Sequence, residues 1–210
     1  MPTAIKLIVG LGNPEPGQLL TRHNAGFWFV DALVNRYALT IKSESRFHAE
    51  VARLSVADHD CLICKPQTYM NNSGRSVQAI SSYYRIPVPE ILVVHDEIDL
   101  EAGVVRFKQG GGHGGNNGLR DIIEKLGDNN FNRLRIGIGH PGNADLVTGY
   151  VLNKPSREDA DLIMSRIGES IDLLPLMLDG DFNRVMTGLH TKVPGPVTDQ
   201  DAGEDHDDIE

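Results

Sequence analysis

The chain has 210 residues, of which 40% are hydrophobic and 23% are charged, and this length favours one substantial core and one domain. No run of about 18 or more apolar residues occurs, and the first residues carry no apolar stretch of signal-peptide type, which excludes a membrane-spanning class and predicts a cytoplasmic protein. The net charge of −9 is unevenly placed: seven of the 29 acidic residues lie in Val193–Glu210, which has no Lys or Arg, so the rest of the chain carries only −2. We predict a folded domain over residues 1–192 and an acidic, disordered tail over 193–210.

Apolar runs and helical spacing alternate along the chain. Ile5–Gly10 is a short apolar run that ends in glycine, which predicts a buried strand. Ile91–His95 is the clearest central strand, because four successive apolar residues suit a position that is covered on both faces. Further strands are predicted at 47–54, 61–64, 104–108 and 133–138, and helices at 26–37, 77–84 and 119–126.

The last long helix has a clear start signal, because Ser156 and Asp159 have the spacing of a capping box. Strands that alternate with helices predict a single α/β sheet sandwiched between helices. The apolar stripe that the last helix would pack on this sheet comprises Ala160, Ile163, Met164, Ile167, Ile171 and Leu174.

The two cysteines, Cys61 and Cys64, have the spacing of a redox pair or of half a zinc site. They fall in a predicted strand, however, where side chains alternate between faces, so an offset of three residues separates the two thiols. We therefore expect two buried strand cysteines, with no disulfide and no bound metal.

A glycine-rich loop, Gly110–Gly118, is of the kind whose backbone amides converge on an anion at a helix N-terminus. It lacks the lysine and spacing of a P-loop, and Gly10–Gly17 does not fit the dinucleotide fingerprint, so no nucleotide cofactor is expected. The window Val104–Arg135 holds six basic and three acidic residues, a local charge of +3 that suits phosphate groups. On charge alone, a solvated surface with ordinary ion pairs explains the window equally well.

A histidine and an aspartate are the candidates for acid–base chemistry. His23 lies in a polar loop just before a predicted amphipathic helix, and histidine titrates near neutral pH. Asp96 follows the central strand, at the end where ligands gather in open α/β sheets, and can orient an imidazole and stabilise its protonated form. Taken singly, a loop histidine is more often merely exposed, and a helix-cap or turn aspartate explains Asp96 equally well.

Asparagines fall at the starts of three loops near strand ends, and a primary amide offers two donors and one acceptor without charge. This suits the recognition of peptide and ester carbonyls, although turn chemistry accounts for any one of them alone. Their joint placement favours a site. The three residues are Asn13, Asn71 and Asn117.

Six motifs follow one another between about Lys6 and His190: Ile8–Pro14, Thr21–Gly26, Pro66–Asn71, His95–Glu97, Gly110–Asp121 and Arg133–Pro141. Together, and in this order, they resemble the bacterial-type peptidyl-tRNA hydrolase family. This resemblance implies a single α/β domain with a mixed, twisted sheet flanked by helices on both faces. It also implies a metal-free and cofactor-free enzyme that hydrolyses the ester between a peptide and the 3′ ribose of tRNA. We further expect a monomer without an obligate protein partner.

The resemblance also implies roles for individual residues. His23 aligns with the general base that activates water, and Asp96 with the carboxylate that supports it. Asn13 aligns with the residue that distinguishes N-blocked peptidyl-tRNA from free aminoacyl-tRNA, and Asn117 with a substrate contact that also holds the water. The other implied contacts to the substrate or to the acceptor end of tRNA are Tyr69, Asn71, Arg106, Lys108 and Arg135.

Three positions depart from the family pattern. Glu15 stands where the family usually has glycine, and Gln18 stands where it usually has a tyrosine, so a stacking surface is lost there. Gln18 is still assigned to the substrate site by alignment. Asn116 stands where a histidine is common.

Two other function classes compete with this interpretation. A metal-dependent hydrolase could draw on His23, His95, Asp96 and His113, but no metal-ligand spacing supports it, and strand alternation sends His95 and Asp96 to opposite faces. A non-catalytic RNA-binding module would use the basic window, but only 6% of the residues are aromatic and a binder has no need of a His–Asp pair.

Overall fold

The computed structural model describes residues 4–56 and 58–190. The described residues form a seven-stranded mixed sheet with the order β2-β3-β4-β1-β5-β7-β6. The four inner strands β4, β1, β5 and β7 are parallel to one another, whereas the β2–β3, β3–β4 and β6–β7 pairs are antiparallel. The strands are β1 (Leu7–Gly10), β2 (Lys42–Glu44), β3 (Ala49–Val56), β4 (His59–Pro66), β5 (Ile91–Glu97), β6 (Val105–Gln109) and β7 (Asn132–Gly137).

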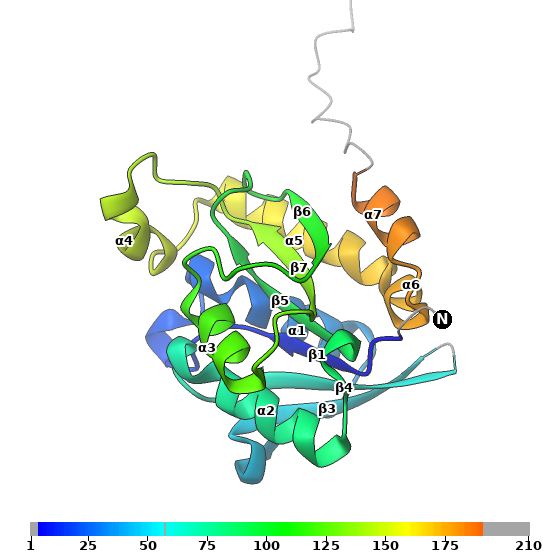
Figure 1. Ribbon diagram of the computed structural model, residues 1–210. Coiled ribbons are helices and arrows are strands. Elements are labelled where there is room, and N and C mark those ends of the chain that lie inside the picture. Colours follow the sequence, from blue (N-terminus) through cyan, green and yellow to red (C-terminus); the bar gives the residue numbers. More distant parts are fainter. Residues whose placement is uncertain (1–3, 57, 191–210) are drawn as a thin grey trace, which may run out of the picture.

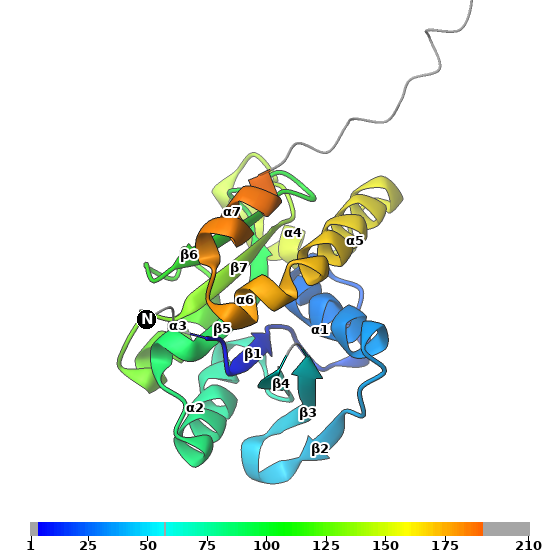
Figure 2. The ribbon, with the colours of Figure 1, turned by 90° about the vertical axis from the view of Figure 1, so that its right-hand side faces the viewer.

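Helices cover both faces of this sheet (Figures 1 and 2). One face packs against α1, α5, α6 and α7, and the other packs against α2 and α3. This confirms the predicted α/β class, with one domain and a mixed sheet between helices. The helices are α1 (Ala25–Arg36), α2 (Ser73–Tyr84), α3 (Asn117–Leu126), α4 (Val147–Val151), α5 (Arg157–Asp172), α6 (Leu174–Asp179) and α7 (Phe182–His190).

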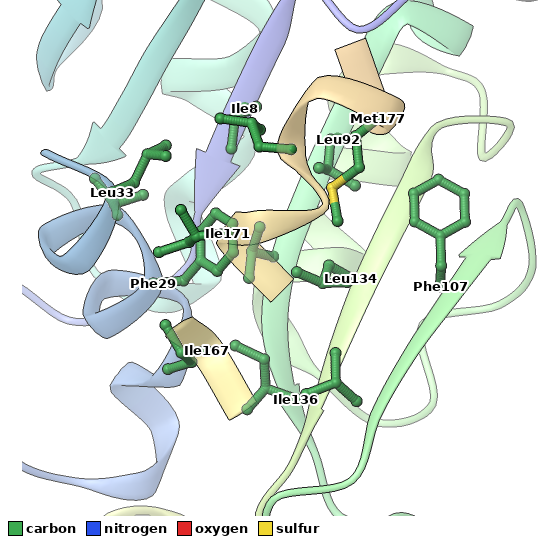
Figure 3. Packing of buried hydrophobic residues seen from close by; sticks show 14 of the residues in the cluster. Ile8, Phe29, Leu33, Leu92, Phe107, Leu134, Ile136, Ile167, Ile171 and Met177 are labelled. Carbon is green, nitrogen blue, oxygen red and sulfur yellow. The ribbon is translucent and has the colours of Figure 1, made fainter. Parts of the chain in front are cut away.

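The alternation of side chains along the strands divides the core in two. In β5, Leu92 and Val94 face the cluster around α1 and α5, part of which is shown in Figure 3, whereas Ile91 and Val93 face α2 and α3. All four side chains are fully buried, as expected of a parallel strand that is covered on both sides.

The two cysteines follow the same rule. Cys61 lies in the cluster on the α1 side and Cys64 in the cluster on the α2 side, and both are free and buried. Burial raises the pKa of Cys61 to about 12 and also raises the pKa of Cys64. Both thiols are therefore protonated near neutral pH. Their burial on opposite sides of the sheet is the arrangement predicted from the strand position.

Some boundaries differ from those expected. The strand predicted from residue 47 begins at Ala49, because Ser45–Phe47 forms a 3-10 turn and His48 adopts a left-handed conformation with φ 49°. The apolar stripe of the last helix is interrupted: Ser156 does cap α5, but Met164 is 44% exposed and Leu174 belongs to α6.

Two glycines bring the first helix close to the central strands. A Cβ atom on Gly26 would lie 2.3 Å from the carbonyl oxygen of Val94, and one on Gly10 would lie 2.3 Å from the carbonyl oxygen of Gly26. Any side chain at either position would push α1 away from β1 and β5. The start of α1 is thereby fixed over the end of β5.

Among residues 4–56 and 58–190, no helix combines the length and apolar character needed to cross a bilayer. The predicted acidic tail, Val193–Glu210, and the predicted domain boundary at residue 192 lie outside the described residues and stay predictions.

Candidate active site

The parallel strands β4, β1, β5 and β7 end at the same edge of the sheet, and the loops that follow them line a cavity of about 480 Å³ there. This is the edge at which open α/β sheets bind ligands. The predicted site residues that line the cavity are Asn13, His23, Tyr69, Asn71, Asp96 and Asn117.

Asp96 lies at the end of β5 with a side chain that is only 4% exposed. Its Oδ2 lies 2.9 Å from Nδ1 of His23, and its Oδ1 accepts a hydrogen bond of 3.0 Å from the amide of Asn116. Each carboxylate oxygen is thus fixed by a different side chain.

His23 is presented by the 3-10 turn Arg22–Asn24, which leads directly into α1. A carboxylate oxygen is an acceptor, so Nδ1 of His23 carries the proton and Nε2 keeps a free lone pair. Burial lowers the pKa of His23, but the charge of Asp96 and the hydrogen bond to it raise the pKa by more, so the net pKa lies above the ordinary value of histidine. The pair has the geometry of an imidazole base with an orienting carboxylate.

Asn13 is held by three hydrogen bonds in the loop after β1. Its Oδ1 accepts from the backbone N–H of Met70 at 2.8 Å, and its backbone N–H donates to Oδ1 of the buried Asn24 at 2.9 Å. The Asn24 amide donates in turn to the Asn13 carbonyl at 2.9 Å. Because Oδ1 of Asn13 is occupied, its amide group is left to donate into the cavity.

Tyr69 and Asn71 form the rim of the cavity beside Asn13. Tyr69 is 62% exposed, and a hydrogen bond to Glu15, together with the charge of Glu15, raises the pKa of Tyr69. Glu15, one of the departures from the family pattern, therefore lies close to this phenol at the rim.

Asn116 and Asn117 lie where the glycine-rich loop meets α3. Asn116 is the N-cap of α3, and its Oδ1 accepts from the backbone N–H groups of Gly118 and Leu119 at 3.0 and 3.1 Å. Its amide at the same time donates to Asp96, so one side chain joins the start of α3 to the acidic partner of His23. Asn117, the next residue, is exposed and lines the cavity.

A short helix, α4, forms another wall through Val147, Thr148 and Val151. Arg22 holds this wall: its Nη1 donates to the carbonyl oxygens of Asn153 and Lys154 at 3.3 and 2.9 Å, and its guanidinium lies 4.0 Å from the centre of the Tyr150 ring. The residue before His23 is thus bound to the end of α4.

The three predicted basic contacts are not among the residues that line this cavity, and they lie on the face of β6 and β7 opposite the buried core residues of these strands. Arg106 lies directly opposite Arg135 in the β6–β7 ladder, and Lys108 lies opposite Arg133. Arg135 pairs with Glu97 at 2.8 Å.

Gln18 does not join the other site residues. It ends the 3-10 turn Pro16–Gln18 and is not among the residues that line the cavity, and its Oε1 is buried without a hydrogen-bond partner among the described residues. Its assignment to the substrate site rests on alignment alone and stays a prediction.

The residues of the competing metal site are not arranged as ligands. His95 points to the opposite face of β5 from Asp96, as strand alternation predicts, and its Nδ1 lies 2.7 Å from the Asp96 carbonyl oxygen. Burial lowers the pKa of His95 despite the nearby charges of Asp96 and Glu97. Within the described parts of the chain, no group of three or more His, Cys, Asp or Glu side chains is placed to hold a metal ion.

Several residues of the site were not identified from the sequence. In the sequence, Arg22 is recognisable only as one residue of a polar loop. Helix α4 has five residues, which is too short for a helical pattern of apolar residues to show. Asn116 was singled out only as a departure, although an asparagine just before a predicted helix signals an N-cap. The other cavity residues outside the prediction include Met70, Arg120 and Leu152.

Comparisons with known proteins give a consistent result. A family model described as peptidyl-tRNA hydrolase matches residues 7–195. A peptidyl-tRNA hydrolase from Neisseria meningitidis is 48% identical over 192 residues, which cover 91% of this chain and 100% of the relative. One from Pectobacterium carotovorum is 49% identical over 193 residues, covering 91% and 99%. The crystal structure of peptidyl-tRNA hydrolase from Acinetobacter baumannii superposes with a TM-score of 0.87 at 44% identity, over 91% of this chain and 97% of that chain.

Proposed function

The chain belongs to the peptidyl-tRNA hydrolase family, and we propose that it cleaves the ester between a peptide and the 3′-terminal ribose of tRNA with a water molecule activated by His23. The observation that carries this mechanism is the 2.9 Å contact between His23 and Asp96 in the cavity at the sheet edge. Such hydrolysis would recycle tRNA from prematurely released peptidyl-tRNA.

In the proposed reaction, Nε2 of His23 takes a proton from water as the oxygen attacks the ester carbonyl. The carbonyl π electrons move to its oxygen and form a tetrahedral intermediate. When this collapses, the bond to the ribose 3′ oxygen breaks, and the proton on His23 passes to that oxygen. General-base help of this kind is worth about 10²- to 10⁴-fold in rate.

Asp96 supports the base in two ways. It accepts the proton on Nδ1, which keeps the lone pair on Nε2, and its charge stabilises the imidazolium that forms during attack. Because Asn116 fixes the other carboxylate oxygen, Asp96 cannot rotate away from His23 without breaking that bond.

The amide donors of the cavity account for substrate choice. The free amide of Asn13 is placed to donate to a peptide carbonyl, which free aminoacyl-tRNA lacks. Asn117, at the start of α3, is placed to orient the water or to donate to the developing oxyanion. Tyr69 and Asn71 extend the same wall toward the peptide.

The acceptor end of tRNA is proposed to bind on the basic side chains next to the cavity, Arg106, Lys108 and Arg135. Phosphate contacts of this type position a nucleic acid without reading its bases. We further propose a monomer that acts in the cytoplasm without a protein partner or a cofactor.

The direct test is to incubate the purified chain, with a chelator present, with N-acetyl-aminoacyl-tRNA and separately with the unblocked aminoacyl-tRNA. Release of the amino acid from the blocked substrate alone is expected. An Asn13→Ala variant should lose most of the activity on the blocked substrate, because it lacks the amide that donates to the carbonyl of the blocking group. Free aminoacyl-tRNA has no such carbonyl. Equal release from both substrates by the unaltered chain would contradict the role of Asn13, and loss of activity in chelator would contradict metal-free hydrolysis.

A further inference from the structure

Four cationic side chains gather on one face of the edge strands β6 and β7, and we call them the basic face: Arg106, Lys108, Arg133 and Arg135. Strand alternation produces this surface, because the intervening residues Val105, Phe107, Leu134 and Ile136 are buried in the core on the other side. The four cations form two directly opposed pairs of like charge, an arrangement that destabilises a sheet unless an anion is present.

Little negative charge within the described part of the chain offsets these cations. Glu97 pairs with Arg135 at 2.8 Å, and no other carboxylate of residues 4–56 and 58–190 forms an ion pair with the basic face. Arg133 instead donates to the carbonyl oxygens of Gly111 and Gly112, and Arg106 donates to the carbonyl oxygen of Val105 at 3.0 Å. Arg133 is only 3% exposed, so the accessible cations of the basic face are Arg106, Lys108 and Arg135. Of these three, Arg106 and Lys108 have no acidic partner in the described part of the chain.

The described part of the chain ends at the same edge of the sheet as the basic face, but on the other side of β6. Helix α7 packs on the opposite side of β6, where the rings of Phe107 and Phe182 stack with centroids 4.8 Å apart, and it ends at His190. Strand β6 is the outermost strand of the sheet, with no further strand of the described chain beside it. A segment that continues from α7 has only to pass this edge to reach the basic face.

The segment that continues from α7 is the acidic one. Val193–Glu210 contains seven acidic residues and neither Lys nor Arg, and the first of them is Asp199, nine residues beyond His190. The match to the family model ends at residue 195, so all seven acidic residues lie beyond it. This charge is an addition to the family's domain.

We propose that Val193–Glu210 docks on the basic face and competes there with the tRNA backbone. The competition rests on the proposed function, whereas the docking does not. Nine residues span up to roughly 30 Å, and packed layers are about 10 Å apart, so this length of chain is enough to pass from one side of a strand to the other. Tethering gives the segment an effective concentration on the order of millimolar, so a weak electrostatic contact is enough. The segment would lower the occupancy of this surface by non-cognate nucleic acid while leaving the His23 site unblocked.

The docking itself is tested on the full-length chain without tRNA. A carbodiimide joins carboxylates to amines that they contact, and Lys108 is the one amine on the basic face. At low salt, mass spectrometry should find links between Lys108 and the acidic residues of Val193–Glu210, and uncharged tRNA should suppress them. The matched control is Lys42, which is exposed on β2 at the opposite edge of the same sheet. Absence of links to Lys108, or links to Lys42 of equal yield, would overturn the proposal.

The competition is tested by kinetics on three proteins: the full chain, a chain that ends at residue 192, and a full-length chain with the seven acidic residues replaced by their amides. At about 0.05 M salt, the shortened and amide chains should both show a KM at least about threefold lower than the full chain with unchanged kcat, and the difference should vanish near 1 M, where the Debye length is about 3 Å. Equal KM values at low salt, or an amide chain that behaves like the full chain, would contradict competition. If none of the three hydrolyses the substrate, the proposed function fails, and the cross-links still decide the docking.

Discussion

At the scale of single residues, the site depends on how one carboxylate is held. His23 and Asp96 are each recognisable in the sequence by residue type and position, but they are 73 positions apart, and their 2.9 Å contact follows from the fold. The N-cap bonds of Asn116 are local, but its bond to Asp96 was not predictable, because it exists only when α3 starts beside the end of β5.

Replacing the carboxylate tests its charge. In Asp96→Asn, burial still lowers the pKa of His23, but the charge that raises it is gone, so the acidic limb of kcat/KM against pH should move to lower pH. The rate at the plateau should fall by about 10²-fold or more, because the tautomer of His23 is no longer fixed. The pH profile of kcat/KM measures both effects. Asp145→Asn, an exposed carboxylate near α4, is the control and should change neither.

The raised pKa of His23 also makes the stability of the fold depend on pH. Because the folded pKa of His23 is raised, the protonated form stabilises the fold below the unfolded pKa, and this contribution is lost as pH rises through the folded pKa. The melting temperature of the unaltered chain should therefore exceed that of Asp96→Asn by more at pH 5 than at pH 8. A difference that is constant across this range would contradict the ion pair.

Two variants of Asn116 separate its two tasks. Asn116→Ser keeps an N-cap oxygen for α3 but is too short to reach Asp96, whereas Asn116→Ala loses both contacts. Removal of an N-cap costs about 1 kcal/mol, so the alanine variant should be less stable than the serine variant. Both should lose turnover to a similar degree. Urea unfolding measures the difference in stability, and kcat measures the loss of turnover. A serine variant with full kcat would show that the bond to Asp96 is dispensable.

At the scale of elements, the long and strongly patterned segments were predictable and the short ones were not. The strand at Ile91–His95 and the helices at 26–37 and 119–126 are specified by local apolar patterns. Helix α4 has only five residues, and isolated helices shorter than about 12 residues are marginal in water, so tertiary contacts must hold it. Arg22 provides these contacts, which no local pattern reveals.

Arg22→Lys should therefore loosen the α4 wall without altering the base. A lysine keeps the charge but loses the planar fork and the stacking on Tyr150. We expect KM to rise severalfold while the pH of the acidic limb, which reports His23, stays in place. Arg157→Lys, an arginine with a 97% exposed side chain on α5, is the control. A shifted limb with unchanged KM would mean that Arg22 acts on His23 and not on α4.

At the scale of the whole molecule, the alternation of strands and helices predicted one α/β domain, and the family resemblance implied a mixed sheet. The structure and the comparisons confirm both. The strand order was not predictable, because it depends on which strands pair across long stretches of chain. The charge distribution was visible in the sequence as a basic window and an acidic end, but only the register of β6 and β7 shows that four cations share one face.

The central claim, that His23 is the base in a metal-free hydrolysis, is tested most directly by one comparison. Release of the N-acetyl-amino acid from N-acetyl-aminoacyl-tRNA is measured in single turnover, in excess chelator, for the unaltered chain and for His23→Ala, with circular dichroism to confirm that both are folded. The account predicts a folded variant that is slower by about 10²-fold or more. A folded variant that keeps most of the activity would contradict it.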